Sequence, residues 1–157
     1  MHKTVLCKLK IQESDKSRIQ ATFSDYKIAW QYVSDHVYRT KCRNRLKTHN
    51  ETYQIVRKLI PKLSSALVQE ARNDAIAKSK SSRKHNLKIA PKLKNISIRF
   101  DKRTCSVKGN MISFAANEGK RIKAELESFP FLDKHRCFKN LAPLIFNKNG
   151  QYWVALT

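Results

Sequence analysis

The stretch from Ile96 to Phe114, ISIRFDKRTCSVKGNMISF, decides the fold of this chain. Apolar side chains alternate with polar ones along it, and two turn sequences, DKRT and KGN, interrupt the alternation. A period of two puts every second side chain on one face of a β-strand. Short strands separated by turns at this spacing predict a small, strongly curved sheet or barrel.

The pattern continues on both sides of this stretch. Alternating apolar residues recur at Ile122, Ala124 and Leu126, and a last hairpin is predicted to pair LAPLIF with QYWVAL across NKNG, whose Asn-Gly favours a tight turn. At the other end of the chain, residues 3–11 also alternate but have no neighbouring strand. We therefore expect this first strand to join the distant sheet, which makes the segment between them an insertion.

The inserted segment has the period of helices. Six apolar residues recur at steps of three and four and define one face of a long helix, for which Ser14 or Asp15 offers an N-cap: Ile19, Phe23, Tyr26, Trp30, Val33 and Val37. Tyr26 and Trp30 could stack on bases, but their place in this series favours packing in the core. A shorter helix is predicted to carry Tyr53, Val56 and Leu59 or Ile60, and a third helix Leu63, Leu67, Ala71 and Ala75.

The periodicity fades between Lys78 and Lys94, where KSKSSRKHNLKIAPKLK is rich in charge, as in a basic linker. The predicted fold class is therefore α+β, a small β-barrel interrupted by a helical domain after its first strand. The expected divisions are 1–12 for the first strand, 13–82 for the helical domain, 83–95 for the linker and 96–157 for the rest of the barrel.

Charge restricts the class of partner. The chain has 157 residues with 33 Lys and Arg against 12 Asp and Glu, a formal net charge of +21. A small domain needs a net charge of only about 2–8 for solubility, so a polyanion is the expected partner, and nucleic acid is the first candidate. An anionic membrane is the alternative, but no apolar run approaches the roughly 18 residues of a spanning helix, and MHKTVLCKLK lacks the core of a signal peptide.

Basic residues are densest where the first helix is expected to end. The helix dipole also favours cations at a helix C-terminus, but the number of basic residues here exceeds what capping requires. We therefore predict a phosphate-binding edge at Arg39, Lys41, Arg43, Arg45 and Lys47. The other residues that we assign to RNA or phosphate binding are Lys8, Lys10, Arg83, Lys84, Lys88, Lys92, Lys94, Arg99, Lys102, Arg103, Lys120 and Arg121.

We expect no metal site, cofactor or catalytic residue, and hence no enzyme. The cysteines form no CxxC pair and the histidines are equally scattered: Cys7, Cys42, Cys105 and Cys137, and His2, His36, His49, His85 and His135. Buried or half-buried thiols in a reducing cytoplasm are the simplest interpretation. The acidic residues of the second half form no nuclease motif: Asp101, Glu118, Glu125, Glu127 and Asp133.

Five phrases in this order resemble the N-terminal part of the transposon-encoded OrfB/TnpB family of RNA-guided nucleases and the related compact type V CRISPR effectors. They are the opening VLCKLKI, WQYVSD in the first helix, P-x-L-x-x-x-L-V-Q from Pro61 to Gln69, ISIRFDKRTCSV from Ile96 to Val107, and Tyr152-Trp153-Val154. The resemblance implies a wedge domain, an oligonucleotide-binding-like barrel, interrupted by a helical recognition domain. Together these hold the scaffold of a guide RNA and the short duplex motif beside a DNA target.

In that family a RuvC-type nuclease and a zinc-binding segment follow, and neither is present in these 157 residues. The resemblance thus implies a non-catalytic platform, cytoplasmic and prokaryotic, whose partners are a guide RNA, a target DNA duplex and a separate RuvC-like nuclease chain. A nuclease-free RNA-guided binder, such as a transcriptional repressor, and a chain cut at the domain boundary remain open. The alternative of another class is an unguided structural RNA-binding protein.

The third helix carries the candidate base-reading residues. Ser65, Gln69 and Asn73 stand four residues apart and therefore share one face. Gln and Asn can contact adenine bidentately, although these residues can equally be plain surface. In the resembling family the matching helix lies against the duplex that flanks the target, which implies this role for Gln69, Ser65 and Asn73, with Tyr53 on the preceding helix as an addition.

Overall fold

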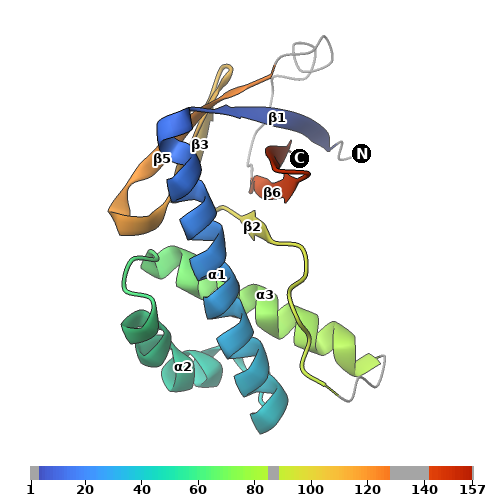
Figure 1. The fold of residues 1–157 in the computed structure, drawn as a ribbon. Coiled ribbons are helices and arrows are strands. Elements are labelled where there is room, and N and C mark those ends of the chain that lie inside the picture. The colour runs from blue at the N-terminus through green and yellow to red at the C-terminus, as the bar shows by residue number, and fades with distance from the viewer. Residues whose placement is uncertain (1–3, 85–88, 128–141, 157) are drawn as a thin grey trace. The chain divides into compact units, whose positions relative to one another are not determined.

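The computed structural model describes residues 4–84, 89–127 and 142–156, without the side chains at 83 and 84. It contains three α-helices and a curled, antiparallel sheet of seven strands, so the predicted α+β class is confirmed (Figure 1). The chain divides into two compact units. A sheet unit comprises Met1–Gln20 and Asn95–Thr157, and a helical unit comprises Ala21–Lys94.

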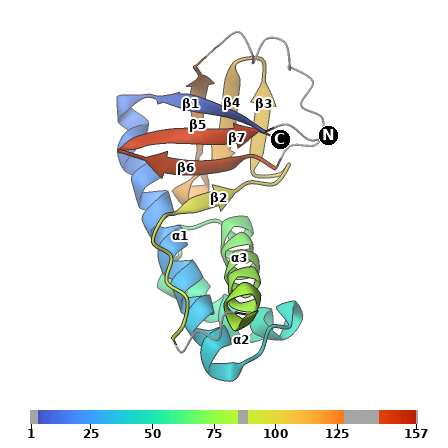
Figure 2. The ribbon, with the colours of Figure 1, turned by 90° about the vertical axis from the view of Figure 1, so that its right-hand side faces the viewer.

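The sheet unit holds its strands in the order β2-β6-β7-β1-β5-β4-β3. Their bounds are β1 Val5–Ile11, β2 Ser97–Arg99, β3 Cys105–Lys108, β4 Met111–Ala115, β5 Arg121–Leu126, β6 Leu144–Lys148 and β7 Gln151–Leu156, with a short 3-10 turn η1 at Asn117–Gly119. Figure 2 shows β1, β7 and β6 side by side. The first strand thus joins a sheet made otherwise from the far end of the chain, as its lack of a local partner predicted, and it takes the middle position.

Strand β1 changes partner along its length, and this change curls the sheet. Its first half pairs with β7, from Val5 opposite Leu156 to Lys8 opposite Trp153. Its second half pairs with β5, from Leu9 opposite Leu126 onwards. Because one strand serves two partners in succession, the sheet bends at this point into a half-barrel instead of lying flat.

The concave side of the sheet forms the core of this unit. One row across four strands is fully buried, with each side chain 0% exposed: Ile98, Ile145, Val154 and Cys7. Phe100 and Phe114 pack against each other with ring centroids 5.4 Å apart. The period of two in the sequence therefore corresponds to alternation between this core and the outer face.

The hairpin between β6 and β7 turns at Asn149 and Gly150, as predicted. Both residues have positive φ, 53° and 78°, which is the requirement of a type I′ turn and the reason that Asn-Gly is favoured there. The Asn147 side chain accepts a hydrogen bond from the Gly150 amide at 3.1 Å, which supports the turn further. The register of the whole hairpin follows from this turn.

The helical unit is built on α1 Glu13–Thr40, whose first residues belong to the sheet unit, on α2 Arg45–Leu59 and on α3 Ser65–Lys84. Trp30 and Tyr26 are 0% and 1% exposed, so the interpretation of both as core residues is confirmed. The Trp30 indole also donates a hydrogen bond to the Asp74 carboxylate at 2.7 Å, and this contact joins α1 to α3.

The predicted helix bounds need correction. Helix α1 begins at Glu13, so neither Ser14 nor Asp15 is its cap. Helix α2 carries Tyr53, Val56 and Leu59 as predicted, and Asn44 caps its start by accepting a hydrogen bond from the Lys47 amide at 3.0 Å. Helix α3 begins at Ser65, so Leu63, which the periodicity assigns to it, lies before its start. Helix α3 continues to Lys84, into the stretch interpreted as a linker, because buried Ser79 extends the inward face of Ala71 and Ala75. Because Ser79 is polar, the apolar period of the sequence did not indicate that the helix continues.

Among the described residues, none of the three helices is long and apolar enough to cross a membrane.

Candidate nucleic-acid interface

The 39–47 cluster, which comprises Arg39, Lys41, Arg43, Arg45 and Lys47, covers the passage from α1 to α2. Arg39 lies in the last turn of α1, where the helix dipole favours a cation. Arg45 and Lys47 lie in the first turn of α2, where the same dipole disfavours a cation. Capping therefore accounts for the first of these charges and not for the others.

Most of these side chains face solvent, and Arg43 is half-buried. Lys41 adopts φ of 58°, and its ammonium lies 3.8 Å from the centre of the Tyr38 ring, so a cation–π contact orients it. Within the described part of the chain, none of the five forms an ion pair with a carboxylate. The cluster is therefore a set of unneutralised cations, as an anion-binding surface requires.

A second group of polar side chains joins α2 to α3. The rings of His49 and Tyr53, one turn apart on α2, have centroids 4.5 Å apart. Nη1 of Arg72 lies 2.6 Å from Nδ1 of His49. The same guanidinium donates to Oδ1 of the adjacent Asn73 from Nη2 and Nε, at 3.0 and 3.3 Å. We call Tyr53, His49, Arg72 and Asn73 the α2–α3 array.

The protonation states of the array are coupled. Burial, and then the positive charge of Arg72, lower the pKa of His49 below its ordinary value. A neutral His49 can accept a hydrogen bond from the Arg72 guanidinium at Nδ1. Burial and the charge of Arg45 likewise lower the pKa of Arg72, while Glu70 opposes them. Arg45 thus links the array electrostatically to the 39–47 cluster.

The structure brings two of the four predicted base-reading residues, Tyr53 and Asn73, into this array. Gln69 is half-buried one turn before Asn73 on α3, and Ser65 is exposed one turn earlier still. Oδ1 of Asn73 already accepts two bonds from Arg72, so its amide nitrogen is the group left for a base. Sequence reasoning placed Arg72 on the polar face of the third helix but did not select it, and it missed His49 as a functional candidate, although the spacing of four between His49 and Tyr53 indicates a shared face.

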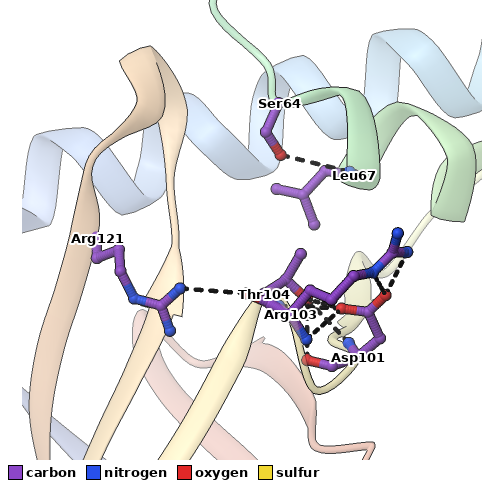
Figure 3. Close-up of polar contacts among 6 residues, drawn as sticks. All are labelled: Ser64, Leu67, Asp101, Arg103, Thr104 and Arg121. Atoms are coloured by element: carbon purple, nitrogen blue, oxygen red, sulfur yellow. Dashed lines mark hydrogen bonds and ion pairs between the residues drawn. The ribbon is translucent and has the colours of Figure 1, made fainter.

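Several predicted phosphate-binding residues of the sheet unit have partners within the protein. Lys10 lies 3.7 Å from Glu125 in an exposed ion pair. The Arg103 guanidinium binds the Asp101 carboxylate at 2.6 and 2.9 Å (Figure 3). Arg121 donates to the Ser113 hydroxyl and carbonyl at 2.9 and 2.8 Å, and to the Arg103 carbonyl at 3.4 Å.

The Asp101 carboxylate organises the DKRT turn. Burial would raise its pKa, but hydrogen bonds from the Arg103 and Thr104 side chains and backbone amides lower it below the ordinary value. Oδ1 accepts from the amides of Arg103 and Thr104, both at 2.9 Å. Figure 3 shows this turn and also Ser64, whose hydroxyl accepts a bond from the Leu67 amide at the start of α3. Arg103 and Arg121 therefore support the β2–β3 turn.

The other predicted phosphate-binding residues are distributed over both units. In the sheet unit, Arg99, Lys102 and Lys120 are exposed and Lys8 is half-buried. In the helical unit, Lys92 and Lys94 are exposed. Arg83 and Lys84 end α3 without described side chains, and Lys88 lies outside the described residues.

A cavity opens where β1 leaves β7 for β5. Its volume is about 660 Å³, and β1, the start of α1 and the β6–β7 hairpin line it. Three lysines, Lys8, Lys10 and Lys16, face it together with Tyr152. Burial raises the pKa of Tyr152, an effect that a hydrogen bond with Asn147 opposes, so its hydroxyl keeps its proton at neutral pH. The split of the sheet thus produces a hollow lined by these three lysines and by one acidic residue, Glu127.

The described thiols are buried or half-buried, as predicted for Cys7, Cys42 and Cys105, whereas Cys137 lies outside the described residues. Burial raises the pKa of Cys7, and burial raises that of Cys105 to about 12 against the lowering effect of Arg121. Such thiols are poor nucleophiles. Within the described ranges, no three His, Cys, Asp or Glu side chains come together as metal ligands.

No protein-family model matches the sequence, and none of the curated proteins does.

Proposed function

We propose that this protein is a nucleic-acid-binding platform that holds RNA on its basic surfaces. The 39–47 cluster carries the proposal, because it concentrates cations that no described carboxylate neutralises. Two of them, Arg45 and Lys47, lie at the start of α2, where the helix dipole disfavours a cation. Each phosphate bound there would release a condensed counterion, which favours association with a polyanion.

The α2–α3 array adds the means to contact bases. Arg72 is held by His49 and Asn73, so little side-chain freedom remains to be lost on binding. The Tyr53 ring and the amide nitrogen of Asn73 offer a stacking surface and a donor, respectively. With Gln69 one turn away, these groups are better suited to contact the edge of a base pair than to contact phosphate alone.

The finer proposal is that the RNA is a guide and that α3 contacts the duplex flanking a DNA target, with cleavage supplied by a separate RuvC-type chain. It rests on the five phrases that resemble the OrfB/TnpB family, on the seven-stranded half-barrel, which is compatible with an oligonucleotide-binding-like wedge domain, and on the helices inserted after its first strand. In such a complex, base pairing reads the target and the protein reads a short flanking motif.

The first experiment is to purify the full chain from its native host and sequence the RNA that accompanies it. One defined RNA that ends in a variable segment is the result expected of a guide-holding platform. Heterogeneous cellular RNA would contradict the guided function and favour an unguided structural RNA-binding protein. Recovery without nucleic acid after washing at low ionic strength would contradict both.

A second experiment addresses the flanking motif. The RNA-loaded protein, with any partner nuclease supplied, is tested for binding to targets that carry matched or altered flanks. Gln69→Ala should relax the preference between flanks, since a bidentate base contact contributes about 1–3 kcal/mol of discrimination. Gln54→Ala on the exposed surface of α2 serves as the matched control. Equal loss on every flank, or loss of RNA binding, would show that Gln69 reads no base.

A further inference from the structure

The outer face of the sheet unit carries two aromatic rings in one cross-strand row. Phe146 on β6 lies opposite Trp153 on β7, which in turn lies opposite Lys8 on β1. Opposite residues share a face, and the adjacent row of the same strands forms the buried core. Both rings therefore belong to the convex face that points away from the core, on the strands seen side by side in Figure 2.

The neighbouring row extends this surface. It contains Arg99 on β2, Leu144 on β6, Ala155 on β7 and Leu6 on β1. Leu6 is 52% exposed, and Phe146, Trp153 and Leu144 are half-buried. Single surface hydrophobic residues are ordinary, but a contiguous patch on adjacent strands marks a binding surface.

Two cations lie near these rings, Lys8 opposite Trp153 and Arg99 opposite Leu144, whereas Ser97 is the residue opposite Phe146. Lys8 flanks Trp153 and also faces the cavity that Lys10 and Lys16 line, while Arg99 is exposed at the β2 side. Within the described residues neither Lys8 nor Arg99 forms an ion pair. Aromatic rings bordered by unneutralised cations match the two parts of a nucleotide, a flat base and a phosphate.

We propose that this face binds an unpaired segment of RNA, whose bases stack on Phe146 and Trp153 while Lys8 and Arg99 contact its phosphates. This proposal rests on the proposed function in one respect, the identification of the ligand as RNA. The Tyr152-Trp153-Val154 phrase thereby gains a specific role for its middle residue. Trp30, fully buried in the helical unit, takes no part.

The test uses the full chain and a short single-stranded oligouridylate. Trp153 is half-buried and Trp30 is fully buried, so stacked bases should quench the fluorescence of Trp153 and leave that of Trp30 unaffected. An abasic strand with the same number of phosphates should bind more weakly and produce no quenching. Equal quenching by the abasic strand would overturn the stacking assignment, and equal affinity for DNA of the same sequence would overturn the assignment to RNA.

Substitutions separate stacking from charge. Trp153→Leu and Phe146→Leu should each weaken oligouridylate binding about tenfold, whereas Trp153→Tyr should retain most of it because a ring remains. Lys8→Gln should reduce the salt dependence of binding, and Lys123→Gln, at an exposed position on β5, is its matched control. Circular dichroism and the melting temperature check each fold; if Trp153→Leu unfolds, Phe146→Leu and the abasic strand decide.

Other outcomes are also informative. Unchanged affinity in folded Trp153→Leu and Phe146→Leu variants would overturn the proposal. A change in oligomeric state by light scattering, without a change in RNA affinity, would overturn it in favour of contact between copies of this chain. Heterogeneous copurified RNA would contradict the guided function while leaving the quenching and its loss in the variants as support for this site.

Discussion

Replacing Arg72 by Gln tests the electrostatic coupling of the α2–α3 array. The substitution removes the positive charge that lies 2.6 Å from Nδ1 of His49. The pKa of His49 should rise, because one of the two causes that lower it is lost. It should stay below its ordinary value of about 6.5, because burial, the larger cause, remains.

The effect on stability should be modest. Of the contacts made by Arg72, the one to His49 joins two helices, whereas those to Asn73 stay within α3. One hydrogen bond between half-exposed groups contributes about 0.5–1.5 kcal/mol, so we expect Arg72→Gln to cost about 1 kcal/mol in the free energy of unfolding. Arg72→Lys should cost a similar amount, because an ammonium cannot span both partners.

The pH dependence gives a second measure of the same contact. Since the folded protein lowers the pKa of His49, its neutral form is favoured in the fold. The resulting stability is fully present above the unfolded pKa of about 6.5 and is lost as the pH falls through the folded value. Stability is thus lost between the unfolded and the folded pKa of His49. Arg72→Gln should narrow this pH range by raising its lower limit, the folded pKa, whereas Arg72→Lys, which keeps the charge, should leave the range nearly unchanged.

The assay is an NMR titration of the histidine ring protons, with His49 assigned by its loss in His49→Gln, combined with urea unfolding at several pH values. Lys123→Gln, in the sheet unit, is the control for a general change in net charge. An unchanged pKa of His49 in Arg72→Gln, or an equal rise in the control, would refute the coupling.

Three further predictions concern the 39–47 cluster, Asp101 and Trp30. Replacing the whole 39–47 cluster by Gln should flatten the log–log dependence of RNA affinity on salt, whose slope is about −0.7 per phosphate contact for single strands, with little change in melting temperature; an unchanged slope would mean that these cations are only solvated. Asp101→Asn should lower the free energy of unfolding at neutral pH and make it depend less on pH in acid. The lowered pKa of the Asp101 carboxyl gives stability that is present above about pH 4 and is lost as the pH falls through the pKa of the folded protein. Acid unfolding curves that coincide with those of the wild type would contradict this prediction. Trp30→Phe should cost about 2–4 kcal/mol, from a lost bond to a charged acceptor and a small cavity, and urea unfolding that shows less than about 0.5 kcal/mol would contradict the Trp30–Asp74 contact.

The sheet could be predicted from the sequence because its two determinants are local. Alternation assigned each side chain to a face, and Asn149-Gly150 set the register of the last hairpin. The membership of β1 in this sheet followed from elimination, since its neighbours in sequence are helical, but its central place was not predicted. Its change of partner at Leu9 could not be predicted, because it depends on the curvature of the assembled sheet.

The site was predicted less completely than the fold. Tyr53 and Asn73 could be placed on the correct helices by periodicity, but the array depends on how α2 and α3 pack, which brings His49 within reach of Arg72. The outer-face pair of Phe146 and Trp153 depends on strand register in the same way. Both groups are formed by residues distant in sequence, which local patterns do not bring together.

The two units use their basic residues differently. In the sheet unit, Arg103 and Arg121 hold the DKRT turn, and Lys10 lies beside Glu125, so much of the charge there supports the fold. In the helical unit the 39–47 cluster has no described carboxylate partner, although repulsion among its cations disfavours the folded state. A bound polyanion would reduce that repulsion, so RNA binding should raise the stability of the helical unit.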